Sequence, residues 1–148
     1  MVTDFTQLNK YIKRPVHPFP SAADIVKQIP SGAKYFAKLD ALQGYHQVLL
    51  HEQSRPLTTF LLPMGKFRYK RGPMGLRSTS DVFCEKTDPT IQDVDNAQKI
   101  VDDILLCAFD ADEIISKLRT VLENCRQRKI ALYRKKLVVG TEMDFAAL

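Results

Sequence analysis

The feature that most constrains this chain is a pair of adjacent aspartates between two apolar runs. In the stretch QKIVDDILLCAF, residues 98–109, apolar residues stand on both sides of Asp102 and Asp103. Two strand-forming runs around a short polar pair predict a tight β-hairpin with the aspartates at its tip. Adjacent aspartates are also ordinary turn residues, so the hairpin alone leaves a purely structural role open.

Other segments predict a mixed fold around this hairpin. The stretch KYFAKLDA, residues 34–41, alternates as a strand does and ends at Asp40. Asp110 and Glu113 form a capping-box pattern ahead of an apolar helical face, which predicts the longest helix. Two more helices are expected, at 22–29 with Ser21 as its cap and from Leu76 to about Asp88. Pro15, Pro18 and Pro20 predict an extended segment, and residues 63–66 predict a turn before FRYKRG. Further strands are expected at 46–52, 57–63, 130–139 and 143–148. The order strand, helix, hairpin, helix, strand predicts an α+β fold, a split βαβ sheet with two helices on one face.

Composition excludes several classes of protein. The 148 residues are 45% hydrophobic and fit one globular domain. The net charge of +5 suits a polyanionic partner, although many proteins without such a partner are equally basic. Cys84, Cys107 and Cys125 have neither zinc-ligand spacing nor a paired disulfide pattern. No apolar run reaches the roughly 18 residues of a membrane span, and the first residues lack a signal-peptide core. We therefore expect an intracellular protein with no membrane partner.

The three aspartates suggest a chemistry. Nucleotidyl transfer needs divalent cations between the attacking 3′-hydroxyl and the triphosphate, and Mg²⁺ takes one or two protein carboxylates per ion. Asp40 at a strand end and Asp102–Asp103 at a hairpin tip supply those carboxylates if the strands are neighbours. We expect Asp102 to be a direct ligand shared by two ions and Asp103 to lie further out.

Six segments in order resemble the reverse transcriptases of gypsy-type LTR retrotransposons. LDALQGYHQ, residues 39–47, is similar to the first catalytic motif, LDxxxGYHQ, and KIVDDILLCA, residues 99–108, is similar to the YxDD hairpin. Ile100 stands where many members have Tyr. The six segments are residues 2–20, 33–50, 66–83, 99–108, 129–139 and 142–148.

The resemblance implies an RNA-directed DNA polymerase, a nucleotidyltransferase that uses dNTPs and two Mg²⁺ ions, with Mn²⁺ as a possible substitute. Asp40, Asp102 and Asp103 would be the catalytic metal ligands. Tyr45 would be a steric gate that rejects the 2′-hydroxyl of ribonucleotides. The other implied substrate-binding residues are Gln43 and Gly44 at the triphosphate, Met74 and Gly75 at the nucleotide and template, and Lys135 or Lys136 at the leaving pyrophosphate.

The resemblance also implies a domain layout. Residues of about 1–35 and 50–75 would be fingers-like, and about 36–49 and 76–148 would form the polymerase palm. We expect the chain to be a part of a Pol polyprotein, and to be without the thumb, RNase H and integrase segments of that polyprotein. Its partners would be an RNA or DNA template with primer, dNTPs and the remaining Pol segments, and its location cytoplasmic. Two alternatives stay open: a catalytically incompetent nucleic-acid-binding remnant, and a transposon fossil with no biochemical role.

Overall fold

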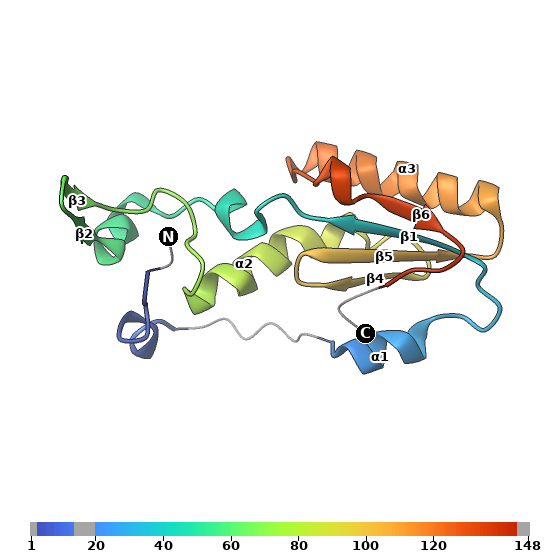
Figure 1. Ribbon diagram of the computed structural model, residues 1–148, viewed down its shortest axis with the longest axis horizontal. Coiled ribbons are helices and arrows are strands. Elements are labelled where there is room, and N and C mark those ends of the chain that lie inside the picture. The colour runs from blue at the N-terminus through green and yellow to red at the C-terminus, as the bar shows by residue number, and fades with distance from the viewer. Residues whose placement is uncertain (1–2, 14–19, 145–148) are drawn as a thin grey trace. The chain divides into compact units, whose positions relative to one another are not determined.

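The computed structural model describes residues 3–13 and 20–144 (Figure 1). These residues divide into two compact units. The first unit contains residues 3–13 and 43–83, and the second contains residues 20–42 and 84–144. No helix within these described ranges is long and apolar enough to cross a membrane. The predicted extended segment at Pro15 and Pro18 lies outside the described residues.

The second unit is built on a four-stranded antiparallel sheet in the order β4-β5-β1-β6 (Figure 1). Its strands are β1 (Tyr35–Asp40), β4 (Ala97–Ile100), β5 (Asp103–Ala108) and β6 (Val138–Gly140). β4 and β5 form the predicted hairpin. β1 pairs with β5 along its whole length, from Tyr35 opposite Ala108 to Asp40 opposite Asp103. The strand that ends at Asp40 and the aspartate hairpin are therefore neighbours.

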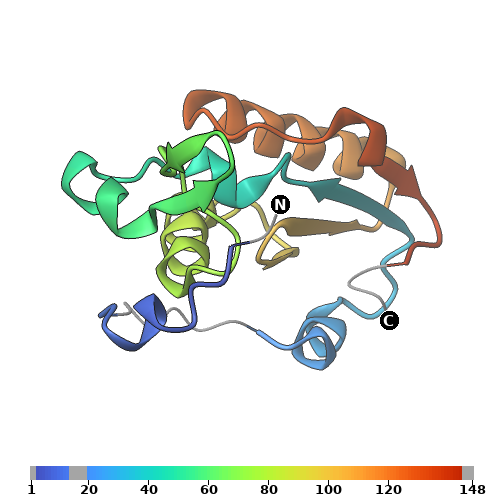
Figure 2. The same ribbon diagram turned by 60° about the vertical axis from the view of Figure 1, so that its left-hand side comes forward.

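Helices cover both faces of this sheet (Figure 2). Helix α3 (Ala111–Gln127) packs its buried residues Ile114 and Val121 on the face that includes Leu39 and Leu106. Because β5 alternates, Leu105 and Cys107 point to the other face, where they pack against Ile25 of helix α1 (Ala22–Gln28). The central strand β5 is thus buried on both sides, which explains its continuous apolar run.

Both predicted helix caps are present. The Asp110 side chain accepts a hydrogen bond from the Glu113 N–H at 2.8 Å, and the Glu113 carboxylate accepts one from the Phe109 N–H at 2.8 Å. Ser21 and Asp24 form a reciprocal capping box at the start of α1. Caps of this kind satisfy backbone donors that a helix leaves unpaired, which fixes where each helix begins.

Helix α2 (Arg77–Thr87) corresponds to the helix predicted from Leu76 and runs into the short 3₁₀ helix η4 (Asp88–Thr90). The Asn124 side chain of α3 donates to the Thr90 carbonyl at 3.0 Å and to the Asp93 carboxylate at 2.8 Å. The η4 turn is therefore held on the α3 side of the sheet. Together these elements make the α+β polymerase-palm fold that the sequence predicts.

The first unit contains a two-stranded antiparallel sheet of β2 (Phe60–Leu62) and β3 (Gly65–Phe67). The Phe60 ring lies 6.1 Å from Phe67 and 5.3 Å from Tyr69 between centroids, and Tyr69 meets Phe5 edge to face at 5.9 Å. This aromatic cluster ties the hairpin to the first residues of the chain. The unit also contains three 3₁₀ helices, η1 (Leu8–Lys10), η2 (Gly44–Gln47) and η3 (Glu52–Thr58).

Three of the predicted strands are wrong in whole or part. Residues 46–52 form parts of η2 and η3, with a single bridge from Leu49 to Arg71 between them. Residues 130–139 are interrupted by the 3₁₀ helix η5 (Arg134–Lys136), so that only the end of this segment joins the sheet as β6. Residues 143 and 144 are not in a strand, and residues 145–148 lie outside the described part.

Candidate active site

Two of the three aspartates face each other across neighbouring strands. Asp40, the last residue of β1, is directly opposite Asp103, the first residue of β5. Directly opposed side chains point to the same face of a sheet, with Cβ atoms roughly 4.5–5.5 Å apart. The backbone extends the pairing, because the Ala41 N–H donates to the Asp102 carbonyl at 2.9 Å. The register of β1 and β5 therefore brings these carboxylates together.

The third aspartate occupies the turn of the hairpin. Asp102 follows Val101, whose φ of 51° lies in the left-handed region that a β-branched residue rarely adopts. The turn buries one carboxylate oxygen of Asp102, Oδ1, which has no hydrogen-bond partner in the described part of the chain. A buried and unpartnered carboxylate oxygen is unfavourable unless a cation or a donor reaches it. We name Asp40, Asp102 and Asp103 the aspartate cluster.

Two lysines contact the aspartate cluster. Lys136 Nζ lies 2.7 Å from Asp40 Oδ2, and Lys38 Nζ lies 3.7 Å from Asp103 Oδ2. The backbone explains how Lys136 arrives there. The Tyr133 N–H donates to the Asp40 carbonyl at 2.8 Å, and the η5 turn then brings Lys136 back toward the Asp40 side chain. Of the two lysines implied by the resemblance, Lys136 is the one that contacts this cluster, and both lysines are exposed.

Crowding of negative charge perturbs the cluster. Burial raises the pKa of Asp102 above its ordinary value of 3.8, and the charges of Asp40 and Asp103 raise it further, while Lys136 and Lys99 act in the opposite direction. Burial also raises the pKa of Asp103; Lys38 opposes this effect, and Asp40 adds to it through its charge and a hydrogen bond. The hydrogen bond to Asp40 raises the pKa of Lys136 above 10.5. Burial and neighbouring negative charge therefore disfavour the ionised forms of Asp102 and Asp103.

The cluster has the chemistry of a hard-cation site but is not arranged as one. In the residues that the structure describes, no three His, Cys, Asp or Glu side chains form a group that could hold a metal ion. Two of the three carboxylates face lysine ammonium groups instead. Hard oxygen donors and the orphaned Oδ1 of Asp102 nevertheless fit Mg²⁺ or Mn²⁺. Lys136 would have to release Asp40 for a cation to bind there.

The gate residue predicted from the resemblance lies in the first unit. Gln43 has a φ of 48°, and this left-handed residue starts η2, in which Gly44 is buried. The Tyr45 ring packs edge to face on Phe83 of α2, with 6.3 Å between centroids. The aromatic contact restricts the rotation of the Tyr45 ring, which is what a residue acting by its bulk requires.

The segment with Met74 and Gly75 is fixed from two sides. Gly75 has a φ of 87°, and its carbonyl accepts a hydrogen bond from the Asn9 side chain at 2.8 Å. The Asn9 carbonyl oxygen in turn accepts from the Arg77 N–H at the start of α2, at 3.0 Å. Met74 is exposed. The conformation at Gly75 therefore needs glycine, and Met74 is available for contact with a ligand.

Several residues of these sites escaped the sequence analysis. A Cβ at Gly72 would lie 2.4 Å from Thr79 Cγ2 and 2.9 Å from the Tyr45 carbonyl, so only glycine fits beside Tyr45. Phe83 supports the Tyr45 ring. Lys99, in β4, is buried among polar groups at the end of α2. The sequence held no signal for these contacts, because each joins residues of different structural elements.

Comparison with known proteins places this chain in a family. Residues 1–146 match the reverse transcriptase (RNA-dependent DNA polymerase) family. The enzymatic polyprotein of Cestrum yellow leaf curling virus is 32% identical, over 100% of this chain and 24% of the polyprotein. Two Drosophila melanogaster Pol polyproteins are also similar: transposon 412 at 30% identity (92% of this chain, 11% of the polyprotein) and transposon gypsy at 32% (83% and 12%). The chain belongs to the reverse transcriptase family, and the predicted similarity to gypsy-type retrotransposons is confirmed.

Solved structures agree with this assignment. The prototype foamy virus protease–reverse transcriptase matches with a TM-score of 0.84 at 25% identity, over 93% of this chain and 18% of that one. A foamy viral protease–reverse transcriptase in complex with double-stranded DNA shares the fold, with a TM-score of 0.90 at 19% identity, over 99% and 26%. The chain thus spans about a quarter or less of the length of these polyproteins.

Proposed function

We propose that this chain is the catalytic core of an RNA-directed DNA polymerase, in which the aspartate cluster holds two divalent cations during nucleotidyl transfer. The observation that carries the proposal is the arrangement of the cluster: Asp40 opposite Asp103, with a buried and unpartnered oxygen of Asp102 beside them. The raised pKa values of Asp102 and Asp103 support it, because burial, and then the neighbouring negative charges, disfavour the ionised carboxylates unless a cation is close.

Bound Mg²⁺ would supply the stabilisation of the attacking 3′-hydroxyl and of the triphosphate charge. Asp102, in the turn, would present its unpartnered oxygen to the cations, and Asp40 would bind them from β1. Lys136 would leave Asp40 and use its flexible side chain to meet the negative charge of the departing pyrophosphate. Lys38 keeps Asp103 partly neutralised, which suits a supporting role for that carboxylate.

The remaining substrate residues are proposed from the resemblance, with support from their local structure. The backbone of Gln43 and Gly44 would approach the triphosphate, and Tyr45, held by Phe83, would exclude a 2′-hydroxyl. Met74 and Gly75 would contact the nucleotide and template. Template, primer, dNTP and the other Pol segments as partners, the division into fingers and palm, and the cytoplasmic location remain predictions.

Primer extension on an RNA template tests the proposal, in a polyprotein that carries this chain. Asp102→Asn should lower extension at least about 10²-fold, because a cation ligand supplies several kcal/mol of transition-state stabilisation. Asp112→Asn, which changes the charge equally at an exposed position in α3, is the matched control and should extend as the parent does. Equal activity of the two variants would refute the assignment of the aspartate cluster.

One observation favours a second candidate, a nucleic-acid-binding remnant without catalysis. The ion pairs of Lys136 and Lys38 already neutralise part of the cluster, and the chain carries a net charge of +5. A remnant of this kind would bind primer–template in a salt-dependent manner but would show no dependence on Mg²⁺. Comparing the binding of parent and Asp102→Asn with and without Mg²⁺ separates the two candidates.

A further inference from the structure

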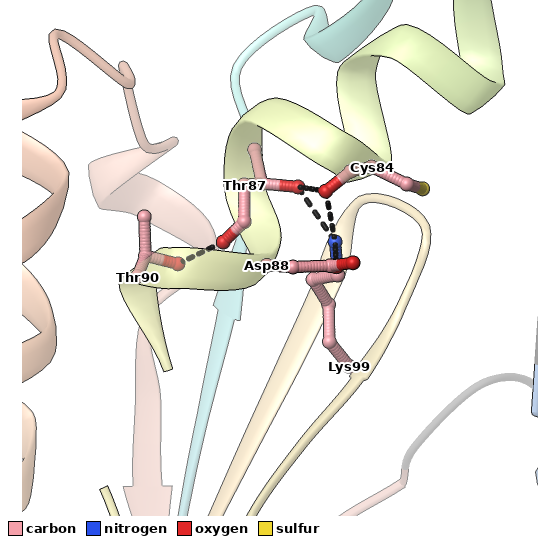
Figure 3. Close-up of polar contacts among 5 residues, drawn as sticks. All are labelled: Cys84, Thr87, Asp88, Thr90 and Lys99. Carbon is pink, nitrogen blue, oxygen red and sulfur yellow. Dashed lines mark hydrogen bonds and ion pairs between the residues drawn. The ribbon is translucent and has the colours of Figure 1, made fainter. Parts of the chain in front are cut away.

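Lys99 is a buried cation outside the aspartate cluster. Its side chain is 7% exposed, although lysine is almost never fully buried without partners. Figure 3 shows its ammonium group among residues of α2 and η4: it donates to the Cys84 carbonyl at 3.1 Å and to the Thr87 hydroxyl at 2.7 Å, and pairs with the Asp88 carboxylate. These three contacts use all three donors of the ammonium group.

The groups that Lys99 contacts are those that a helix end leaves unsatisfied. The last four carbonyls of an α-helix have no partner within the helix, and the C-terminal end attracts positive charge. Cys84 belongs to this last turn of α2. The Thr87 hydroxyl also donates to the Cys84 carbonyl at 3.2 Å, and the Thr90 hydroxyl donates to the Thr87 carbonyl at 2.6 Å (Figure 3). Lys99 therefore completes a closed polar network at this helix end.

The same lysine belongs to the strand that leads into the Asp102 turn. Lys99 is opposite Ile104 in the hairpin, so its side chain points to the face covered by α3. β4 is an edge strand that pairs with β5 alone in the described sheet. An edge strand of four residues is held by one ladder only, and a buried anchor on the face covered by α3 restricts it further.

The orientation of the Asp102 carboxylate depends on the position of the β4–β5 hairpin. Its buried oxygen has no partner among the described residues that could fix its direction, so the backbone of the turn sets where it points. We propose that Lys99 is a positioning residue for Asp102. By joining β4 to the end of α2, Lys99 fixes the β4–β5 turn in the position from which the Asp102 carboxylate can bind a cation. This inference rests on the proposed function of the aspartate cluster.

The test compares Lys99→Met with Lys34→Met in the full chain. Methionine keeps the length and apolar body of lysine but removes the three donors, and Lys34 is an exposed lysine of the same unit. Hydrogen exchange of residues 98–104 should become about tenfold faster in Lys99→Met, the size of a lost charge-assisted hydrogen bond. Exchange in α3 should stay as in the parent, and Lys34→Met should change neither segment.

The second readout is the affinity for Mn²⁺, which is measured from the electron paramagnetic resonance signal of the unbound ion. Lys99→Met should weaken Mn²⁺ binding about tenfold or more, as loss of a group that orients a ligand does, in addition to any fall in melting temperature from the broken network. An effect on melting temperature alone would reduce Lys99 to a structural role and overturn the proposal. So would parental exchange of residues 98–104.

Two further variants keep the outcomes distinct. If Lys99→Met does not fold, Asp88→Asn tests the same anchor, because it removes only the partly exposed carboxylate; unchanged exchange of the hairpin there would overturn the proposal. Asp102→Asn tests the cation site itself. If it binds Mn²⁺ as the parent does, the proposed function fails, while hairpin exchange in Lys99→Met still decides whether Lys99 anchors β4.

Discussion

Replacing Asp102 with asparagine should make the folded chain more stable at neutral pH. The substitution removes one negative charge from a cluster of three and keeps the size of the side chain. Two unit charges about 5 Å apart repel by roughly 0.8 kcal/mol in water and roughly 3.3 kcal/mol at an effective dielectric constant of 20. Lys136 and Lys38 offset part of this repulsion. We therefore expect a net gain of about 1 kcal/mol, or a melting temperature higher by about 2–4 °C for a chain of this size.

The pH dependence of this gain follows from the raised pKa of Asp102. A carboxyl with a folded-state pKa above 3.8 binds its proton more tightly in the folded chain than in the unfolded one. The unfolding free energy of the parent therefore falls as the pH rises from about 3.8 through the folded-state pKa. The advantage of Asp102→Asn should be small near pH 4 and reach its full size by pH 7.

Thermal unfolding of both proteins across this pH range, followed by circular dichroism, is the assay. Mg²⁺ adds a second comparison, because a ligand that binds only the folded state raises its stability. The ion should raise the melting temperature of the parent and leave that of Asp102→Asn almost unchanged. A variant less stable than the parent at pH 7, or an advantage that does not depend on pH, would refute the electrostatic argument.

Three more predictions concern other parts of the chain. In a polyprotein carrying this chain, Tyr45→Val should raise incorporation of ribonucleotides relative to deoxynucleotides in competitive primer extension; unchanged selectivity would make Tyr45 a packing residue. Gly72→Ala should lower the unfolding free energy by about 1–3 kcal/mol in urea, because its Cβ would overlap Thr79 and the Tyr45 carbonyl, whereas Gly140→Ala, whose Cβ meets its nearest atom at 3.3 Å, should change it less. Equal losses of unfolding free energy in Gly72→Ala and Gly140→Ala would contradict the overlap expected at Gly72. The 148-residue chain alone should show little primer extension and should lose roughly 10²–10³-fold in binding between about 50 and 200 mM salt if about five phosphates are neutralised; salt-insensitive binding would contradict an electrostatic interface.

Local patterns predicted the elements whose causes are local. Asp110 with Glu113 and Ser21 with Asp24 fix helix starts through contacts three or four residues apart. The apolar runs around Asp102 predicted the hairpin and the alternation of residues 34–41 predicted the strand ending at Asp40, while the pairing of these two strands was a condition that the structure supplies. In these places the short-range preferences of the chain agree with the final fold.

The failures occur where distant contacts override local preference. The mixture of apolar and basic residues at 130–139 is typical of an edge strand. However, the Tyr133 N–H donates to the Asp40 carbonyl, and the chain then turns through η5, so a continuous strand does not form. Residues 46–52 follow the left-handed Gln43, which starts a 3₁₀ turn in place of a strand. The burial of Lys99 needs the end of α2, which no pattern within β4 encodes.

Val101 places backbone strain in the turn that carries Asp102. A β-branched residue at a φ of 51° is strained by about 1–3 kcal/mol, while asparagine or glycine adopts this conformation easily. Replacing Val101 with asparagine or glycine would therefore relieve this strain and raise the melting temperature. If the aspartate cluster performs the proposed polymerisation, a valine retained at position 101 in related copies would mark a turn kept strained for that function and not for stability.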